Sequence, residues 1–144
     1  MFESCSTLSY NDFKYLMVRL NQNITSLEGL FKNCTGISGD IWYDIFRPCP
    51  NVNSIKEVFS GTKLSGIFFS RTAAYNSEDP STWGILDFLP KVTDAEAAFE
   101  NTSIEWIDNN VFAPIENTYS PLVKIDYMFR GCLLLKSCND TRAS

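Results

Sequence analysis

The chain has 144 residues, the length of a single domain, and 44% of them are hydrophobic, including 11 Phe. The net charge is −5 and the 12 basic residues are scattered, which argues against binding to nucleic acid or to anionic membrane surfaces. No apolar run approaches the roughly 20 residues that a membrane helix needs, so we expect no membrane insertion. The first residues also lack the basic start and the apolar segment of a secretory signal peptide.

The chain contains no His, so nucleophilic catalysis by Ser–His or Cys–His pairs is excluded. Its five Cys include no Cys-x-x-Cys pair, and no zinc-site spacing is present. Adjacent carboxylates, such as Glu78 with Asp79, fit a solvated surface better than acid–base catalysis. We therefore expect a protein that is not an enzyme, with no catalytic residue, no cofactor and no metal site.

One local pattern recurs around five Phe residues, which we call the anchors: Phe2, Phe31, Phe59, Phe99 and Phe129. Apolar residues lie seven, four and one positions before the last four anchors: Ile24, Leu27, Leu30, Val52, Ile55, Val58, Val92, Ala95, Ala98, Leu122, Ile125 and Met128. This spacing predicts a short helix before each of those anchors, with a buried apolar stripe. A helix of about two turns is not stable alone, so such units must pack on one another in arrays.

Two of these expected helices carry a signal for their first residue. Thr25 with Glu28, and Thr93 with Glu96, each fit a capping box at the same distance from the anchor. Ser54 also precedes a Glu by three residues, but it lies one position out of register. The sequence therefore predicts the helix start in two units and makes it plausible in the others.

A small side chain lies three positions after every anchor: Cys5, Cys34, Thr62, Thr102 and Cys132. An aliphatic side chain follows at five or six positions: Leu8, Ile37, Leu64, Ile104, and Leu134 or Leu135. The aliphatic spacing predicts extended strands in Leu64–Phe69 and Ile104–Ile107. We interpret the small position as a cramped site under the helix, where a thiol acts as a small hydrophobe. For the cysteines, this favours buried reduced thiols over a disulfide framework.

Other segments fall between the anchors. Asp12–Leu20 predicts an additional helix with Phe13, Leu16, Met17 and Leu20 on one face. Arg71–Gly84 is polar and predicts a loop that accounts for most of the extra length before the fourth anchor. Residues 136–144 form a polar tail. Asn-x-Ser/Thr sequons occur at Asn23, Asn33, Asn101 and Asn139, and their glycosylation would need a secretory eukaryotic setting.

Pro90 to Ile107 resembles the BspA-like leucine-rich repeat, whose consensus runs roughly Leu-Pro, Val-Thr, an apolar residue, Ala-Phe, Cys, Leu and Ile. Ile24–Ile37 and Val52–Leu64 resemble the related surface-lipoprotein repeats, which have Met-Phe and Cys anchors. The resemblance implies an α/β fold: a leucine-rich-repeat-like solenoid of about four irregular strand–helix repeats, uncapped at the N-terminus. We expect one such domain over residues 1–144, as part of a longer array, because the chain opens at the anchor Phe2, halfway through a repeat and without a capping element. The anchors are spaced irregularly, at 29, 28, 40 and 30 residues, so the repeats are not strictly regular.

Two classes of function remain open. The resemblance implies a non-catalytic module that binds a protein or a glycan, for adhesion at a cell surface. The alternative is a structural component of a larger assembly, such as a virus or phage particle or a fibre, in which the repeats pack against neighbouring subunits. The partner-binding candidates are Tyr75 and Trp83, which flank the polar tip Asn76–Thr82, together with Trp42 and Trp106. The competing interpretation is that the loop rings fold back and cover the side of the repeats.

Overall fold

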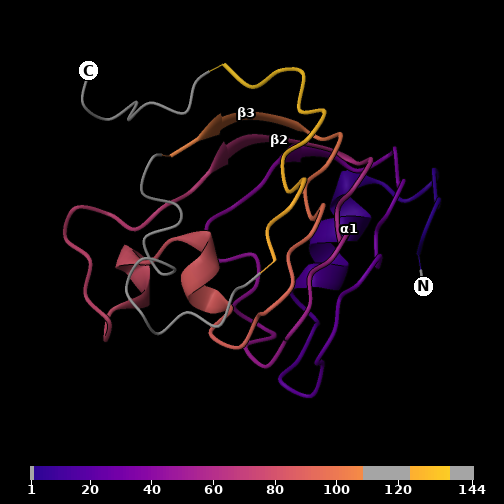
Figure 1. The fold of residues 1–144 in the computed structure, drawn as a ribbon. Helices are drawn as coiled ribbons and strands as arrows, with labels where there is room; N and C mark the ends of the chain where they lie inside the picture. The colour runs from indigo at the N-terminus through magenta and orange to yellow at the C-terminus, as the bar shows by residue number, and fades with distance from the viewer. Residues whose placement is uncertain (1, 109–123, 137–144) are drawn as a thin grey trace.

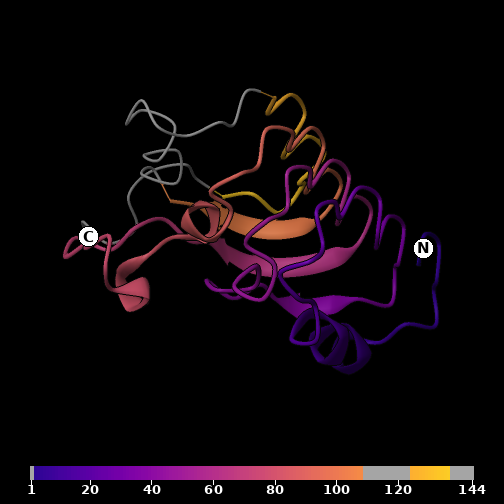
Figure 2. The same ribbon diagram turned by 90° about the horizontal axis from the view of Figure 1, so that it is seen from below.

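The computed structural model describes residues 2–108 and 124–136. These residues form one α-helix, α1 (Tyr10–Met17), and three strands, β1 (Ser38–Asp40), β2 (Lys63–Phe68) and β3 (Ser103–Ile107). Two short 3-10 helices, η1 (Pro80–Thr82) and η2 (Ile85–Phe88), lie between β2 and β3 in the chain. The strands form one open parallel sheet in the order β1-β2-β3. Figures 1 and 2 show α1 beyond β1, at the end of the sheet opposite β3.

The prediction of a leucine-rich-repeat-like solenoid of about four strand–helix repeats is wrong. Among the described residues, the segments expected to be helices before Phe31, Phe59, Phe99 and Phe129 are runs of tight turns. The single α-helix of this part of the chain lies elsewhere, at Tyr10–Met17, and its sheet has three strands. The expected capping boxes do not form either. Instead, Ser26 and Asp94 accept the backbone N–H two residues later, in local turns, at 3.2 and 3.0 Å.

Left-handed backbone explains why no helix forms before the anchors. The residues two positions before and two positions after an anchor have positive φ, and a right-handed helix cannot contain such residues at this frequency. Asn and Gly two positions after the anchors tolerate this conformation well. The φ values before the anchors are 64° at Gly29, 55° at Glu57, 54° at Ala97 and 59° at Tyr127. Those after are 60° at Ser4, 59° at Asn33, 76° at Gly61, 58° at Asn101 and 75° at Gly131.

The turns are held by hydrogen bonds to one another, and we call this arrangement the turn column (residues 2–5, 26–34, 54–62, 94–102 and 124–132). The N–H groups of Leu27, Gly29, Phe31 and Asn33 donate to the carbonyls of Ser54, Lys56, Val58 and Ser60 at 2.7–3.0 Å. The same four positions donate from the third turn to the fourth and from the fourth to the fifth. Phe2 and Ser4 donate in the same way to Leu30 and Lys32. Figure 2 shows the turns stacked side by side in chain order.

The anchors lie behind these turns and form the centre of the core. Consecutive anchor rings are 5.7, 6.0, 5.4 and 5.8 Å apart along the series. Phe31, Phe59 and Phe99 are at most 1% exposed. Three of the four pairs are stacked and the Phe59–Phe99 pair is tilted by 50°, so the recurring Phe is a packing pattern.

The helix predicted in Asp12–Leu20 is present as α1, although it begins at Tyr10 and ends at Met17, so Leu20 lies beyond it and Leu16 is only half-buried. Phe13 and Met17 are fully buried, and the Phe13 ring meets Phe31 and Phe59 edge-on at 5.1 and 5.6 Å. A capping box begins the helix: Ser9 Oγ accepts the Asp12 N–H, and Asp12 Oδ2 accepts the Ser9 N–H, both at 3.1 Å. The predicted strands are also present as β2 and β3.

The small side chain three positions after an anchor also donates a hydrogen bond to an anchor carbonyl in the turns described next. Thr62 and Thr102 donate their hydroxyl hydrogen to the carbonyl of their own anchor, at 2.8 and 2.9 Å. Cys34 and Cys132 donate their thiol hydrogen to the anchor carbonyl of the turn before, that of Phe2 at 2.7 Å and that of Phe99 at 3.2 Å. The expectation of buried reduced thiols is confirmed for Cys34, Cys49 and Cys132, whereas Cys5 is half-buried. Cys138 lies outside the described residues.

Candidate partner-binding cleft

The insertion between β2 and η2 is an ordered loop. At its base, Thr72 N–H donates to the Thr82 carbonyl at 3.0 Å. At its tip, the Asn76 carbonyl accepts from the Trp83 indole Nε1 at 3.0 Å, and Asn76 N–H donates to Thr82 Oγ1 at 2.9 Å. Asp79 caps η1 by accepting the Ser81 N–H at 3.1 Å. These local bonds fix the polar tip, and they also fix the plane of the Trp83 ring.

A partly buried ion pair closes the loop against η2. Arg71 donates from Nε and Nη2 to Asp87 Oδ1 at 3.0 and 2.8 Å. Asp87 Oδ2 also accepts the Gly84 N–H at 3.0 Å. The hydrogen bond to Asp87 raises the pKa of Arg71 above its usual value, against the opposing effect of burial. The guanidinium carbon lies 3.8 Å above the Tyr75 ring, so the cation also orders that side chain.

Trp83 borders a hollow of about 260 Å³ that we call the Trp83 cleft. The half-buried indole packs on Phe88, with the ring centroids 5.0 Å apart. Three proline rings and two charged side chains complete the lining, which consists of Arg47, Pro50, Pro80, Trp83, Asp87, Phe88 and Pro90. A second hollow of about 310 Å³ is also bordered by Trp83. The Trp83 cleft therefore has rigid, mainly apolar walls, as binding sites for apolar groups generally do.

The charged residues of the Trp83 cleft already have partners. Arg47 Nε lies 3.0 Å from Asp44 Oδ2, and its guanidinium carbon lies 5.2 Å from the centre of the Phe88 ring. Asp87 is held by Arg71, as described above. An ionised Asp with both oxygens accepting hydrogen bonds is a poor general base. The described residues also contain no group of three or more His, Cys, Asp or Glu side chains that could hold a metal ion.

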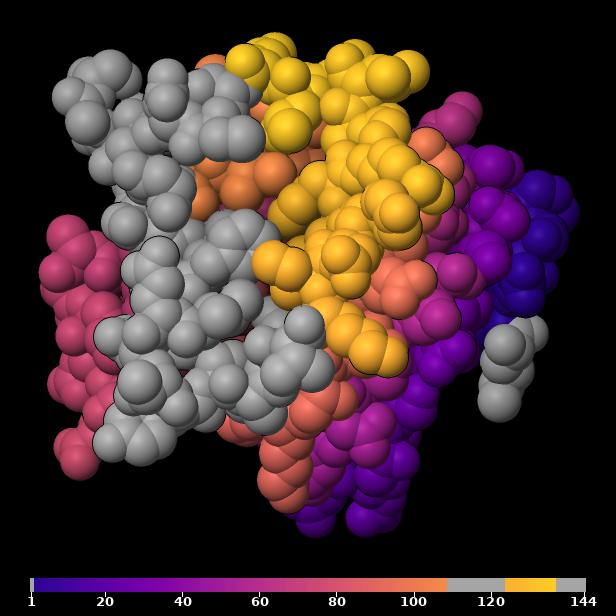
Figure 3. Space-filling view, in the orientation of Figure 1, coloured from indigo at the N-terminus to yellow at the C-terminus, as the bar shows by residue number. Residues whose placement is uncertain are grey.

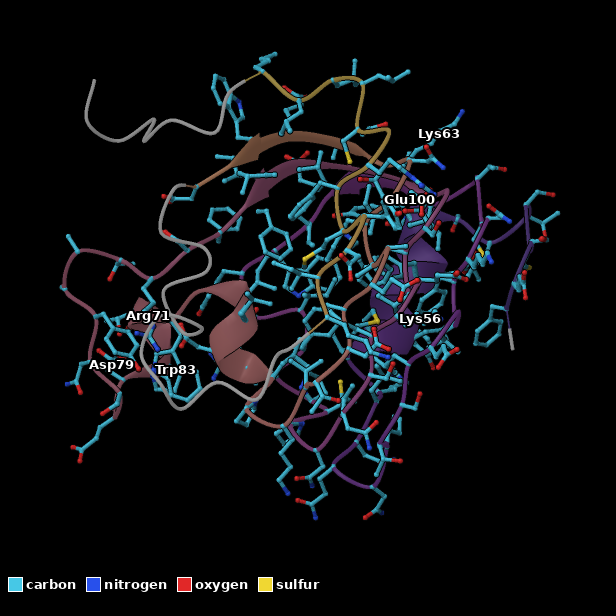
Figure 4. All side chains as sticks on the ribbon, in the orientation of Figure 1. Lys56, Lys63, Arg71, Asp79, Trp83 and Glu100 are labelled. Atoms are coloured by element: carbon cyan, nitrogen blue, oxygen red, sulfur yellow. The ribbon has the colours of Figure 1, made fainter. Side chains whose placement is uncertain are left out.

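The structure separates the four aromatic residues predicted to bind a partner. Trp83 and Tyr75 belong to the loop, and Tyr75 is 38% exposed. Trp42 packs on Phe13 of α1 at 5.7 Å, and Trp106 of β3 lies 5.7 Å from Lys136 Nζ. Figure 4 shows Arg71, Asp79 and Trp83 grouped at the loop, apart from Lys56, Lys63 and Glu100. Of the four, only Trp83 lines the cleft, so the prediction for Tyr75, Trp42 and Trp106 gains no support from it.

Sequence reasoning missed the prolines of the Trp83 cleft. Nothing in the sequence groups Pro50 or Pro90 with Trp83, and Pro80 is predicted only as part of the polar tip Asn76–Thr82. They come from three different segments, and the fold brings them together around one indole. A signal was present, since each proline lies near an aromatic residue in the chain, but that pattern also fits turns.

In the part of the chain that the structure describes, no helix has both the length and the apolarity needed to span a membrane.

Comparison with known proteins provides no further guide to the cleft. No protein-family model matches the chain. No curated protein and no solved structure matches it either. The resemblance to BspA-like repeats, with the cell-surface or virion location that it implies, therefore stays a prediction.

Proposed function

We propose that this protein is a non-catalytic binding module that receives an apolar side chain of a protein partner in the Trp83 cleft. The observation that carries the proposal is a half-buried Trp forming one wall of a hollow whose other walls are mainly proline and Phe. Trp is among the residues that most often dominate the binding energy of protein interfaces. Association at this site requires no catalytic group.

The geometry favours a protein partner over a glycan. A sugar ring that stacks on an indole also needs polar groups to bind its hydroxyls. Arg47 and Asp87 are the charged groups of the lining, and both already form ion pairs within the chain. An apolar side chain needs no such groups and gains its affinity from the water-exposed area that it buries.

The loop structure further supports binding at low entropic cost. The indole N–H bond to Asn76 and the ring contact with Phe88 hold Trp83 in one orientation before any partner arrives. A side chain that is already ordered loses little conformational freedom on association. Trp83 thus combines a large contact area with preorganisation.

A random peptide display library, selected on the immobilised chain, tests this proposal. We expect enriched peptides with an aromatic or branched aliphatic residue, and we expect Trp83→Ser to weaken their binding about tenfold or more, the range of a hot-spot residue. Lys63→Ala is the matched control, because Lys63 is exposed and distant from Trp83 in Figure 4. Circular dichroism verifies that both variants are folded.

Two results would count against the cleft. If selection enriches no peptide and a glycan array gives binding that depends on Trp83, the partner class is wrong. Alternatively, the enriched peptides could bind the Trp83→Ser and Lys63→Ala variants equally well, which would place the binding surface elsewhere.

A second candidate function is a packing role within a larger assembly. It is favoured by the exposed large apolar side chains, four of which lie in residues 124–136: Ile125, Tyr127, Leu133 and Leu134. Native gel filtration of material from the source organism tests this role. A complex much larger than the chain's 16.3 kDa supports packing, and elution at the size of the monomer contradicts it.

A further inference from the structure

The last described turn of the turn column, residues 124–132, presents a row of unused backbone donors. In the three preceding turns, the N–H groups four and two positions before the anchor, at the anchor and two positions after it donate to the next turn. The equivalent groups of the last turn belong to Ile125, Tyr127, Phe129 and Gly131. Within residues 2–108 and 124–136 these four N–H groups have no hydrogen-bond acceptor. Such a row is a template for pairing with another chain.

An apolar side chain of this turn is also exposed, whereas the equivalent side chains of the three turns before it are buried. Ile125 is 42% exposed, whereas Leu27, Ile55 and Ala95 at the equivalent position are at most 2% exposed because the next turn covers them. Leu133 and Leu134 beside it are 93% and 54% exposed. Figure 3 shows this segment, in yellow, at the surface in front of the earlier layers. This face therefore has the same apolar positions as the buried turns, but no described residue covers it.

The opposite end of the turn column offers the complementary groups. The carbonyls of Glu3, Ser26 and Glu28 accept no hydrogen bond from the described residues, although the equivalent carbonyls of later turns do. The Phe2 ring stacks on the Phe31 ring, and no second ring of the described residues stacks on Phe2. Beside it, α1 and the residue after it expose Tyr15 and Val18, at 58% and 59%. Within the described residues, the four N–H groups at one end of the column have no acceptor, and the carbonyls of Glu3 in the first turn and of Ser26 and Glu28 in the second have no donor.

The direction of the hydrogen bonds determines how two copies can meet. Two identical donor ends cannot pair with each other, because neither supplies carbonyls along that row. The residue directly after each anchor is, in chain order, Glu3, Lys32, Ser60, Glu100 and Arg130, so acidic and basic side chains alternate apart from Ser60, and Arg130 pairs with Glu100. Glu3 of a further copy would extend this alternation at the open end next to Arg130.

We propose that the open face of residues 124–134 binds the first turn and α1 of a second copy of this chain, in a head-to-tail arrangement. Phe129 then stacks on Phe2 of the next copy, and the Gly131 N–H donates to its Glu3 carbonyl. Because the two surfaces differ, the contact is heterologous and can continue from copy to copy. The inference rests on the packing role proposed above and names its partner.

Analytical ultracentrifugation of the complete chain over a concentration series tests the inference. We expect a mass that rises with concentration without stopping at a dimer. Leu133→Glu places an acid on the donor end, facing the acidic Glu3 region, and Glu3→Lys places a cation against Arg130. Each variant should weaken self-association about tenfold or more, because like charges then meet. Ser77→Glu is the control, since it adds the same charge on an exposed loop residue away from both ends.

Mixing the two variants gives the sharpest result. The Glu3→Lys chain keeps an intact donor end, and the Leu133→Glu chain keeps an intact acceptor end. An equimolar mixture should therefore associate, although each variant alone is a monomer. A wild-type chain that remains monomeric at every concentration, or a mixture that remains monomeric, overturns the inference. In that case a large native complex in the gel filtration above would leave the packing role standing with a different partner.

Discussion

Three residues after each anchor, the side chain has to be small and has to donate a hydrogen bond. Thr62 and Cys34 are chemically different, yet each places one hydrogen on an anchor carbonyl. The hydroxyl reaches the carbonyl of its own turn, whereas the longer C–S bonds place the thiol against the turn before. Each of these carbonyls also accepts a backbone N–H, from Thr62 at 3.1 Å and from Cys5 at 3.0 Å, so the side chain adds a second hydrogen bond and its own polar hydrogen is satisfied near the core. This requirement explains why Thr and Cys replace one another along the chain.

Cys49 is a separate case, because it lies outside this position and is fully buried. Burial disfavours the thiolate and raises the pKa of the thiol from 9.0 to about 11. The folded chain therefore holds this proton more tightly than the unfolded chain does. The resulting contribution to stability is complete below about pH 9 and is lost as the pH rises through 11.

Urea unfolding of wild type and Cys49→Ala at a series of pH values measures this contribution. We expect the stability difference between them to shift by about 2–3 kcal/mol against the wild type between pH 8 and 11, from about 1.4 kcal/mol per pKa unit. Other alkaline titrations cancel in the comparison, and the cavity left by Ala adds only a constant cost. A pH-independent difference would mean that Cys49 is solvated in the folded chain.

At the scale of the element, the turn column and a series of short helices make opposite predictions for one substitution. Ala97 has a φ of 54° in a tight turn, where Gly avoids the steric cost that a Cβ imposes. In a helix interior the same Ala→Gly change would cost about 1 kcal/mol. The sign of the effect therefore distinguishes the two conformations.

We expect Ala97→Gly to leave the free energy of unfolding unchanged or to raise it by up to about 1 kcal/mol. Ala95→Gly is the matched control, because Ala95 is buried in the same turn without a positive φ. It should lower stability by about 0.5–1 kcal/mol. Denaturant unfolding measures both, and an equal loss in the two variants would restore the helical interpretation.

At the scale of the molecule, the stacked anchors couple the turn column to the sheet. Phe99 contacts the Phe59 and Phe129 rings of the neighbouring turns and meets Phe68 of β2 edge-on at 4.9 Å. We expect Phe99→Ala to lower the free energy of unfolding by about 3–5 kcal/mol, the usual cost of removing a buried ring. Thr72→Ala, on the exposed side of the loop, should change it by less than about 0.5 kcal/mol.

Thermal unfolding followed by circular dichroism measures both variants. A single transition, shifted strongly only for Phe99→Ala, is the expected result, since each turn is buried by its neighbours. Equal melting temperatures would show that the anchor ring is dispensable, and two separate transitions would show that the column and the sheet unfold independently.

The sequence by itself determined much of the core and the positions of α1, β2 and β3. Phe13 and Met17 on one face of α1, the aliphatic spacing of β2 and β3, and the recurring anchor Phe were all readable from periodicity. The loop that carries Trp83 and Tyr75 was readable from its polarity. These features depend on local preference and on the tendency of apolar side chains to leave water, and both are written in neighbouring residues.

Only the tertiary structure decided the backbone of the turn column and the shape of the Trp83 cleft. Apolar residues seven, four and one positions before an anchor fit a helix, and they equally fit turns that stack. The choice depends on whether an N–H group such as that of Phe31 bonds within its own segment or to Val58, 27 residues away in the chain. Pro50, Pro80 and Pro90 likewise meet around Trp83 only after these long-range bonds have set the layers, because no local preference brings distant segments together.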